Sequence, residues 1–531
     1  MKKLSMDEIA KNICRKANAD FVLVNATNTW LEETPKVEES SVFWLTGFSG
    51  DTGDCLITKQ GKCFLFVDGR YHIQADNEVR DGVEVEKLQL GQRQDEEIAK
   101  KIKNNSTFAV VGSKISVARL ENFKKLFAKN SVKLKVLDKD IVFDALCKKK
   151  RFHSLFNRLF TLSVLSRGTK TGCKPRVFRP KIATLFSNLD DVAYLTRMRD
   201  FKTKSGASRI YSYLFVEPDG KMKLLRNLIC LEKFLKKYHQ PIVIDKKTTS
   251  AYVASLIKQP IYEESKVGEF RVVKTNEEIS ALRKAFAISD KALLATREYI
   301  ETSKKPISEF DIYENLKRNF QKFGAYGLSF EPIVAINKNS ALAHYGEHSK
   351  NIFLNEGDLV LIDCGVYGRE GLATDTTRVF VKGKPNDLQQ KVYTLVLRAF
   401  LNAYATNDKT GFEMNALAHE ILDNQVYVKN HNDAFVFNHG LGHGIGISVH
   451  ETPPSLSSAD VAKQAFKEYM CFTIEPGLYH HVFFGIRLEN SFFRKNGKNC
   501  TLTKIGFEKK LILFDELNDF EKQVLQDFEL I

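Results

Sequence analysis

The sequence lacks the segments that place a protein in or across a membrane. No uninterrupted apolar stretch reaches the roughly 20 residues that a spanning helix requires. The first residues, MKKLSMDEIAKNICRKANADF, contain two lysines but no apolar core of about 7 to 15 residues, so they do not form a secretory signal. We therefore expect a cytoplasmic protein with no membrane partner.

Paired cysteines are also missing. The nine cysteines are an odd number, are scattered along the chain and form no CxxC pair. Cys364 and Cys471 lie inside segments that we predict to be buried strands. Reduced cysteines of this kind behave as small apolar residues, as expected in the cytosol. The pattern excludes a disulfide-built fold and indicates no Cys/His catalytic arrangement.

Acidic residues are absent from residues 148–181, although the chain has a net charge of +15 and a pI of about 9.1. The basic residues there are Lys148, Lys149, Lys150, Arg151, Arg158, Arg167, Lys170, Lys174, Arg176, Arg179 and Lys181. Such a run is found in nucleic-acid-binding proteins. No zinc finger, RNA-recognition pattern or helix-turn-helix accompanies it, so we interpret the run as a solvated linker and expect no nucleic-acid partner.

Carboxylates are present at an informative spacing in the segment LVLIDCGVYGREGLATDTTRVFV, whose two apolar runs and glycine-bearing turn predict a β-hairpin. Asp363 and Asp375 lie six residues either side of Arg369. In a hairpin symmetric about Arg369 they would face each other, with Cβ atoms about 5 Å apart. Two carboxylates that close repel unless a cation lies between them.

The same pattern recurs where Glu475 and Glu489 lie seven residues either side of Val482. His443 stands among glycines at 440, 442, 444 and 446, which permit close approach of the backbone. Four carboxylates and one imidazole suit Mn²⁺, Zn²⁺, Co²⁺ or Fe²⁺. Two such ions, about 3.5 to 4 Å apart, would hold a hydroxide as nucleophile.

Each of these residues has an ordinary structural interpretation when it is taken alone. A strand carboxylate is usually solvated, and a single histidine is usually structural. The glycine string differs from a dinucleotide fingerprint, which needs a strand, a turn and a helix with an acidic residue about 20 positions on. Two mirrored carboxylate pairs around a glycine-flanked histidine together favour a two-metal hydrolase.

The stretches LIDCGVYGREGLATDTTR, HGLGHGIGISVHE, TIEPGLY and GIRLEN resemble, in order and spacing, the metal-binding blocks of the pita-bread metallopeptidases. The resemblance implies a two-metal site at Asp363, Asp375, His443, Glu475 and Glu489. It further implies that His344 and His450 contact the substrate or the intermediate, that His439 lines a proline pocket, and that Arg487 steadies a metal carboxylate.

The activity implied by the resemblance is metal-assisted peptide hydrolysis, with Glu475 as the acid/base that takes a proton from the nucleophile and passes it to the leaving amine. A catalytically silent relative that serves as a binding protein is the alternative from another class. The complete set of candidate ligands argues against it.

At 531 residues the chain is long enough for two or three domains. The tract GFSGDTG followed by DGRY resembles the first domain of prolidases and Xaa-Pro aminopeptidases, and LFSNLDDVAYLTRMRDF resembles a repeated middle domain of the long Xaa-Pro aminopeptidases. We therefore expect an α/β (α+β) protein: two creatinase-N-like domains at 1–147 and 148–265, the second including the basic linker, and a pita-bread catalytic domain at 266–531.

The long Xaa-Pro aminopeptidases hydrolyse the bond between an N-terminal residue and a following proline. The resemblance therefore implies proline-containing peptides as substrates, two divalent ions, with Mn²⁺ favoured, and a homodimer. Prolidase, which hydrolyses Xaa-Pro dipeptides, is the nearer alternative.

Local signals predict several elements. Thr275 and Glu278 form a capping box ahead of an apolar helical stripe, and a second helix is expected between Ser308 and Gly324. A helix is predicted over 6–18, strands within 20–26, 54–70 and 108–113, and a hairpin around Pro218, Asp219 and Gly220.

Overall fold

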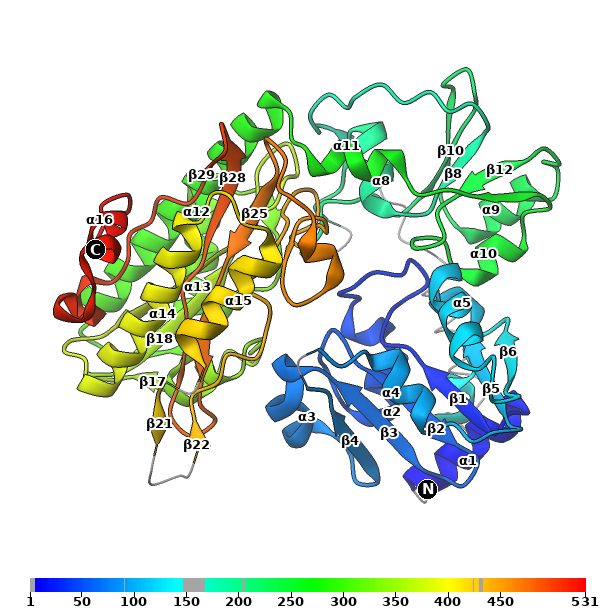
Figure 1. Cartoon of the computed structure of the whole chain (residues 1–531), viewed down its shortest axis with the longest axis horizontal. Coiled ribbons are helices and arrows are strands. Elements are labelled where there is room, and N and C mark those ends of the chain that lie inside the picture. The colour runs from blue at the N-terminus through cyan, green and yellow to red at the C-terminus, as the bar shows by residue number, and fades with distance from the viewer. Residues whose placement is uncertain (1–4, 90, 147–167, 203–205, 424, 429–432) are drawn as a thin grey trace. The chain divides into compact units, whose positions relative to one another are not determined.

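The computed structural model describes residues 5–89, 91–146, 168–202, 206–423, 425–428 and 433–531 (Figure 1). The chain divides into two compact units. The first comprises residues 1–166, 177–192 and 211–266, and the second comprises residues 167–176, 193–210 and 267–531. The border predicted at residues 147 and 148, and most of the basic run that follows it, lie outside the described residues.

The first unit contains a six-stranded mixed sheet of order β4-β3-β2-β1-β5-β6. Its strands are β1 (Phe21–Val24), β2 (Asp54–Thr58), β3 (Cys63–Val67), β4 (Val83–Lys87), β5 (Thr107–Val111) and β6 (Lys133–Leu137). The helices around it are α1 (Met6–Ala17), α2 (Ser41–Thr46), α3 (His72–Glu78), α4 (Gln94–Lys100), α5 (Val117–Leu126) and α6 (Val142–Leu146).

A second sheet in the same unit repeats this topology without the edge strand β4. Its order is β11-β10-β8-β12-β13, formed by β8 (Thr184–Phe186), β10 (Tyr213–Val216), β11 (Met222–Leu225), β12 (Ile242–Ile244) and β13 (Pro260–Tyr262), with α9 (Leu228–Leu235) and α10 (Ala251–Ser255). Helix α8 (Leu189–Thr196) begins in this unit and ends in the second one. In both sheets the first strand pairs antiparallel with the second and parallel with a later one. The first unit thus contains two sheets of the same topology, while their division into two domains stays a prediction.

Backbone hydrogen bonds join the two sheets at the starts of α5 and α10. The Val117 N–H donates to Thr249 O at 3.0 Å, and the Ala251 N–H donates to Ile115 O at 2.9 Å. The Lys246 ammonium pairs with Glu121 at 2.8 Å across the same junction. These contacts hold the two sheets together in the first unit, whereas residues 167–176 and 193–210 of the predicted second domain belong to the second unit.

The second unit is built on short strands covered by long helices. The helices are α11 (Lys266–Val272), α12 (Asn276–Thr302), α13 (Glu309–Phe323), α14 (Asp387–Ala405), α15 (Gly411–Leu422) and α16 (Asp519–Leu525). The main strands are β16 (Ile333–Ile336), β18 (Leu359–Cys364), β20 (Thr376–Val381), β25 (Cys471–Ile474), β26 (Gly477–Tyr479), β27 (Gly485–Arg487), β28 (Asn490–Lys495) and β29 (Lys498–Thr501). The shorter strands are β7 (Thr169–Lys170), β9 (Met198–Arg199), β14 (Ile307–Ser308), β15 (Gly327–Leu328), β17 (Phe353–Leu354), β19 (Val366–Tyr367), β21 (Tyr427–Val428), β22 (Asp433–Ala434), β23 (Gly442–His443) and β24 (Ser455–Leu456).

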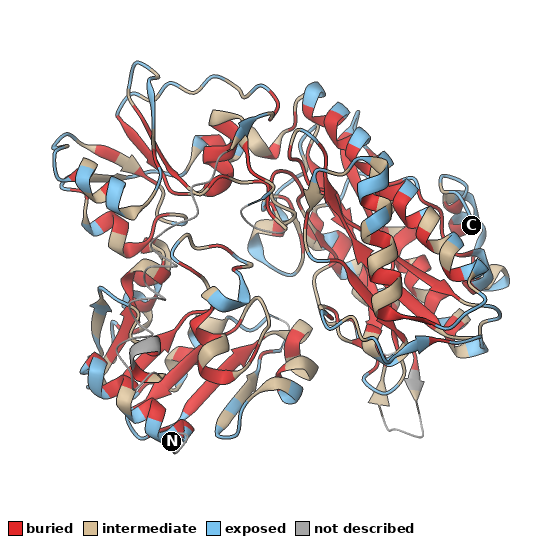
Figure 2. Ribbon diagram, turned by 180° about the vertical axis from the view of Figure 1, so that it is seen from behind, coloured by how far each residue is buried: buried red, intermediate tan, exposed pale blue. Residues whose placement is uncertain are grey.

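Every residue of strand β18 is buried, and Figure 2 shows buried residues, in red, along most of the central strands of this unit. Leu359 and Leu361 pack in a cluster that includes residues of α14, whereas Val360 and Ile362 pack with residues of α12 and α13. Successive side chains of a strand point to opposite faces. Asp363 therefore continues the row of Leu359 and Leu361, on the face toward α14.

The locally signalled elements are confirmed. Helix α12 begins with the capping box of Thr275 and Glu278, and α13 begins after Ser308 and ends at Gly324, whose φ of 94° is left-handed. The predicted helix over 6–18, the strands of the first sheet and the hairpin around Pro218 to Gly220 are present as α1, β1, β2, β3, β5, β10 and β11.

The predicted register of the first carboxylate hairpin is wrong by two residues. Asp363 pairs with Thr377, so the hairpin is centred on residue 370 instead of Arg369. The turn closes between Gly368 O and the Gly371 N–H at 3.0 Å, and Gly371 adopts a left-handed φ of 69°. A slip of two residues keeps side chains on the same face. Asp375 is therefore diagonal to Asp363 but still on its face.

Arg378, fully buried on β20, ties this hairpin to the second one. Its guanidinium donates to the carbonyls of Gly506, Thr377, Glu489 and Ile505 and to the side-chain oxygen of Asn490, at 2.6 to 2.9 Å. A planar guanidinium offers five N–H donors. Each of them has an acceptor here, so Arg378 fastens β20 to β28 and to the C-terminal segment.

We predict that Arg378→Lys lowers the free energy of unfolding by about 3 kcal/mol or more. A lysine has three donors, so at least two buried acceptors would lose their partner, and each such loss costs about 1–3 kcal/mol. The midpoint of urea unfolding is the measurement, with Arg369→Lys in the exposed turn as the matched control. Equal midpoints for the two variants would contradict this role.

Candidate metal centre

The candidate ligands come from two hairpins and one glycine-rich segment. Asp363 is near the end of β18, and Asp375 directly precedes β20. Glu475 and Glu489 interrupt the second hairpin between β25 and β26 and between β27 and β28. The register on both sides, with Ile474 opposite Asn490 and Gly477 opposite Arg487, places the two glutamates opposite each other. The predicted pairing about Val482 is thus confirmed.

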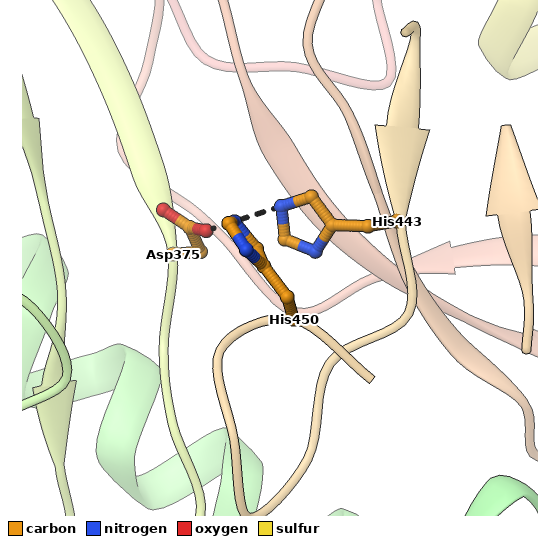
Figure 3. A group of neighbouring side chains, drawn as sticks. All are labelled: Asp375, His443 and His450. Carbon is orange, nitrogen blue, oxygen red and sulfur yellow. Dashed lines mark ion pairs between the residues drawn. The ribbon is translucent and has the colours of Figure 1, made fainter. Parts of the chain in front are cut away.

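The five side chains converge on one place. Ligand atoms of Asp363, Asp375 and Glu489 lie within 4.8 Å of one another, and the same holds for His443, Glu475 and Glu489. His443 Nε2 lies 3.3 Å from Glu475 Oε1 and 3.5 Å from Asp375 Oδ2. Figure 3 shows the His443 ring directed toward Asp375.

Burial and the repulsion of neighbouring acids make Asp375 and Glu489 hard to ionise. Burial, followed by the charges of Glu489, Asp363 and Glu475, raises the pKa of Asp375 well above its usual value. Burial also raises the pKa of Glu489, and the nearby Glu475 and Asp363 raise it further. A divalent cation between the carboxylates would remove this repulsion and favour their charged forms.

Two buried oxygens fit such a cation. Asp363 Oδ1 and Glu489 Oε1 lie away from solvent without a hydrogen-bond partner among the described residues, which is costly for a carboxylate. His443 Nδ1 lies 3.0 Å from Gly444 O, and an Nδ1–H donating to that carbonyl leaves Nε2 as the ligand atom. The donor set therefore fits hard or borderline divalent metal ions.

Arg487 holds one of these carboxylates in place. Its Nη2 donates to Asp363 Oδ2 at 2.6 Å, and its Nε lies 3.2 Å from Thr377 Oγ1. The Thr377 hydroxyl donates in turn to Glu489 Oε2 at 2.8 Å. Arg487, predicted to steady a metal carboxylate, thus contacts Asp363 directly and Glu489 through Thr377, and its role toward a metal stays a prediction.

Two residues that the sequence analysis did not assign, Thr377 and Tyr479, complete this network. Arg487 Nη1 donates to Tyr479 Oη at 2.8 Å, and Tyr479 Oη lies 2.8 Å from His439 Nε2. His439 Nδ1 also lies 2.8 Å from Gly440 O. The structure therefore places His439 at the end of a hydrogen-bonded chain that leads through Tyr479 and Arg487 to Asp363.

His450 lies beside the candidate ligands, on the loop that follows His443. Its ring and the His443 ring are 4.2 Å apart and nearly perpendicular, and a nitrogen of His450 belongs to a potential ligand group with Asp375 and His443 (Figure 3). Gly444 permits this tight loop, because a Cβ there would lie 2.0 Å from Glu451 O.

His344 follows the short helical turn η4 (Asn337–Ala341) and is partly buried. The preceding carbonyl, Ala343 O, accepts a hydrogen bond from Arg487 Nη2 at 3.3 Å. The structure thus links the backbone next to His344 to the arginine that holds Asp363.

His480 and His481, to which we assigned no role, group with Asp433 at the far end of β26. The Val482 N–H donates to His480 Nδ1 at 3.2 Å, and the His480 ring packs against Phe435 and Phe483. His480 thereby stabilises the turn between β26 and β27, which suits a structural residue.

Comparison with known proteins identifies the family and the fold. The Creatinase/Prolidase N-terminal domain matches residues 8–143, and Metallopeptidase family M24 matches residues 280–494. The chain is 32% identical to the uncharacterized peptidase YqhT of Bacillus subtilis over 48% of its own length and 68% of that protein. The chain belongs to metallopeptidase family M24.

This M24 chain is also 35% identical to the Xaa-Pro dipeptidase of Pyrococcus furiosus, over 45% of its own length and 65% of that relative's, just under two thirds. Its fold resembles the crystal structure of X-prolyl aminopeptidase from Caenorhabditis elegans, described as a cytosolic enzyme with a di-nuclear active site. The TM-score is 0.79 with 18% identity, and the match covers 99% of this chain and 96% of that one. This likeness confirms the predicted α/β fold with a pita-bread domain.

Among the residues that the structure describes, no helix combines the length and apolar character needed to cross a membrane.

Glu451, the residue after His450, fastens the histidine-bearing loop through a buried ion pair that the sequence did not reveal. Its carboxylate accepts from Lys274 Nζ at 2.9 Å, from Arg271 Nη1 at 2.8 Å and from the Ile447 N–H at 2.8 Å. Burial alone would raise the pKa of Glu451, but the two cations outweigh it and lower the pKa to about 2.

We predict that Glu451→Gln destabilises the M24 chain by about 3–5 kcal/mol at neutral pH, since the change leaves two buried cations without their anion. A folded pKa lowered from 4.5 to about 2 means that this stabilisation is fully present above about pH 4.5 and is lost as pH falls toward 2. Unfolding curves between pH 7 and pH 2 should therefore show the difference from the native sequence shrinking on acidification.

The exposed substitution Glu420→Gln is the matched control and should show no such pH dependence. A difference for Glu451→Gln that stays constant down to pH 2 would rule out the ion pair as its cause.

Proposed function

We propose that this M24 chain is a metal-dependent Xaa-Pro aminopeptidase, which removes an N-terminal residue that precedes proline. The observation that supports it most strongly is the convergence of Asp363, Asp375, His443, Glu475 and Glu489, with buried carboxylate oxygens available for a cation. Such a set has no evident structural purpose, since the repulsion between its acids opposes folding.

The five residues would hold two divalent ions, of which Mn²⁺ is favoured and Zn²⁺, Co²⁺ or Fe²⁺ are compatible. Such ions supply Lewis-acid polarisation of the scissile carbonyl and lower the pKa of water at the site. Arg487 and Thr377 then act on the protein side: they orient the carboxylates of Asp363 and Glu489 through the hydrogen bonds described above.

Glu475 is the proposed acid/base residue. Its side chain is the most exposed of the four carboxylates. The exposed fraction is 18% for Glu475, 13% for Asp363 and 7% for Asp375, and Glu489 is buried. A peptide therefore reaches the Glu475 carboxylate more readily than the others. Glu475 would accept a proton from the attacking water and donate it to the nitrogen of the departing proline.

His450 and His344 are proposed to donate hydrogen bonds to the substrate carbonyl and to the charge that develops on it. The position of His450 beside His443 supports its role, and the link of the His344 backbone to Arg487 supports a place for His344 at the same centre. His439 is proposed to line the proline pocket, with its ring oriented by Tyr479 Oη and Gly440 O.

The choice of an aminopeptidase over a dipeptidase rests on the length of the chain and its repeated sheet. The first unit holds two sheets of the same topology, and the fold likeness to the C. elegans X-prolyl aminopeptidase extends over nearly the whole chain. The sequence likeness to the P. furiosus Xaa-Pro dipeptidase favours the second candidate, a prolidase. We also propose that the protein is a homodimer, the commonest form of soluble oligomer.

Purified protein, stripped of metal with a chelator and reloaded with Mn²⁺, should release the first amino acid from a Xaa-Pro-Xaa peptide. We expect activity to disappear on chelation and to return with the metal, and kcat/KM to be higher for the tripeptide than for a Xaa-Pro dipeptide. Preference for the dipeptide would identify a prolidase. Activity that survives complete removal of metal, or no hydrolysis of either peptide in any of the four metals, would refute the proposal.

We predict that Glu475→Gln lowers kcat at least about 10²-fold, because an amide cannot shuttle the proton. The melting temperature of the metal-free protein should not fall, since the change removes one of four repelling charges. Glu298→Gln on the exposed face of α12 is the control and should keep full activity. Near-normal turnover by Glu475→Gln would exclude it as the acid/base.

A further inference from the structure

A second buried carboxylate, outside the candidate metal centre, organises the loop that contains His344. Glu309 is the first residue of α13 and is 0% exposed. Its Oε1 accepts from the Ile336 N–H at 2.8 Å and from Asn339 Nδ2 at 2.9 Å. Its Oε2 accepts from Tyr345 Oη at 2.7 Å and from the Ser349 N–H at 3.0 Å.

The residues that supply these four donors stand on both sides of His344 in the sequence. Ile336 and Asn339 precede it, and Tyr345 and Ser349 follow it, so a single side chain fastens both ends of the loop. The next residue on either side of His344 is also fixed: Ala343 O accepts from Arg487, and Tyr345 donates to Glu309. His344 therefore lies between an anchor that reaches Asp363 and an anchor at the start of α13.

A carboxylate side chain fits all four donors, and an amide does not. A carboxylate accepts hydrogen bonds at both oxygens and donates none, whereas an amide replaces one acceptor with an NH₂ group that would face two donors. The first turn of a helix also favours a negative charge. The loop needs a strong anchor, because Asn337 and His348 adopt left-handed φ values of 43° and 45°, which non-glycine residues rarely do.

We infer that Glu309 is a positioning residue for the proposed reaction: it holds the loop of residues 336–349 in the one conformation that presents His344 to the substrate. The inference rests on the proposed function. Glu309 itself does not touch the candidate ligands in any hydrogen bond that the described residues show, so its effect on turnover is expected to pass through His344.

Glu309→Gln should lower kcat about 10²-fold on a Xaa-Pro-Xaa peptide, the size of loss expected when a catalytic group is displaced by about 1 Å. The number of Mn²⁺ ions bound per chain should not change, since none of the candidate metal ligands lies in the loop of residues 336–349. Hydrogen exchange should be faster at the Ile336 or the Ser349 amide, because the NH₂ group of glutamine replaces the oxygen that accepts from one of them.

A double-mutant cycle with His344→Ala separates positioning from general loss of stability. If Glu309 acts through His344, then Glu309→Gln added to His344→Ala lowers kcat by less than about 3-fold. If the two losses multiply, Glu309 acts independently of His344 and the inference is wrong.

Asp311→Asn is the matched control. Asp311 lies two residues further along the same helix and caps it by accepting from the Ser308 N–H at 2.9 Å and the Ser308 hydroxyl at 2.7 Å, without contacting the His344 loop. It should reduce thermal stability and leave kcat within about 2-fold of the native value. An equal loss of kcat in both variants would show that turnover depends on the integrity of α13 and not on the hydrogen bonds between Glu309 and the loop.

Tyr345→Phe removes one of the four donors and provides a milder variant should Glu309→Gln fail to fold. It should lower kcat by about 10-fold and should also be non-additive with His344→Ala; additive behaviour would overturn the inference.

Failure of the native chain to hydrolyse the peptide would instead refute the proposed function, so the two failures are distinguishable. Unchanged exchange at Ile336 and Ser349 in Glu309→Gln would contradict the anchor without reference to activity.

Discussion

The second unit is organised around the repulsion between four carboxylates that its fold brings to one place. Burial and this repulsion raise the pKa values of Asp375 and Glu489 well above their usual range. Arg487 offsets only part of the charge, through its contact with Asp363. The apo scaffold must therefore hold these acids together at a cost in free energy, which binding of cations would relieve.

The scaffold resists this repulsion because its strands are fixed from several sides. Strand β18 packs on both faces. Arg378 on β20 makes buried hydrogen bonds to Glu489 and Asn490 at the start of β28 and to Ile505 and Gly506 in the C-terminal segment. Thr377 lies directly opposite Asp363 and donates to Glu489, so the two hairpins are connected at the level of the acids themselves. Interiors packed in this way are stiff, and the acids cannot move apart without breaking those contacts.

Much of this arrangement could be predicted from the sequence, because it depends on spacing within hairpins and on local helix signals. The pairing of Glu475 with Glu489 and the capping box at Thr275 are of that kind. The register around Asp363 could not be predicted from the sequence. It depends on the position of the turn, and therefore on which glycine adopts the left-handed conformation; Gly371 does so. Contacts over long separations were also inaccessible: Glu451 resembles a solvated acid until Lys274, 177 residues away, is placed beside it.

The metal-ligand candidates and the histidines are held by different means. The four acids lie on or next to paired strands, where a ladder of backbone hydrogen bonds fixes their direction. His344 and His450 lie in loops without such a ladder, and in each loop a buried carboxylate takes its place: Glu309 accepts two backbone N–H groups around His344, and Glu451 accepts the Ile447 N–H ahead of His450. A carboxylate that receives several donors constrains a loop almost as closely as a strand partner would, because each lost bond leaves a buried group unpaired. Substitutions in these loops are then tolerated only where the hydrogen-bond donors are kept. The sequence around the histidines is therefore as restricted as the sequence of the strands beside the candidate metal ligands.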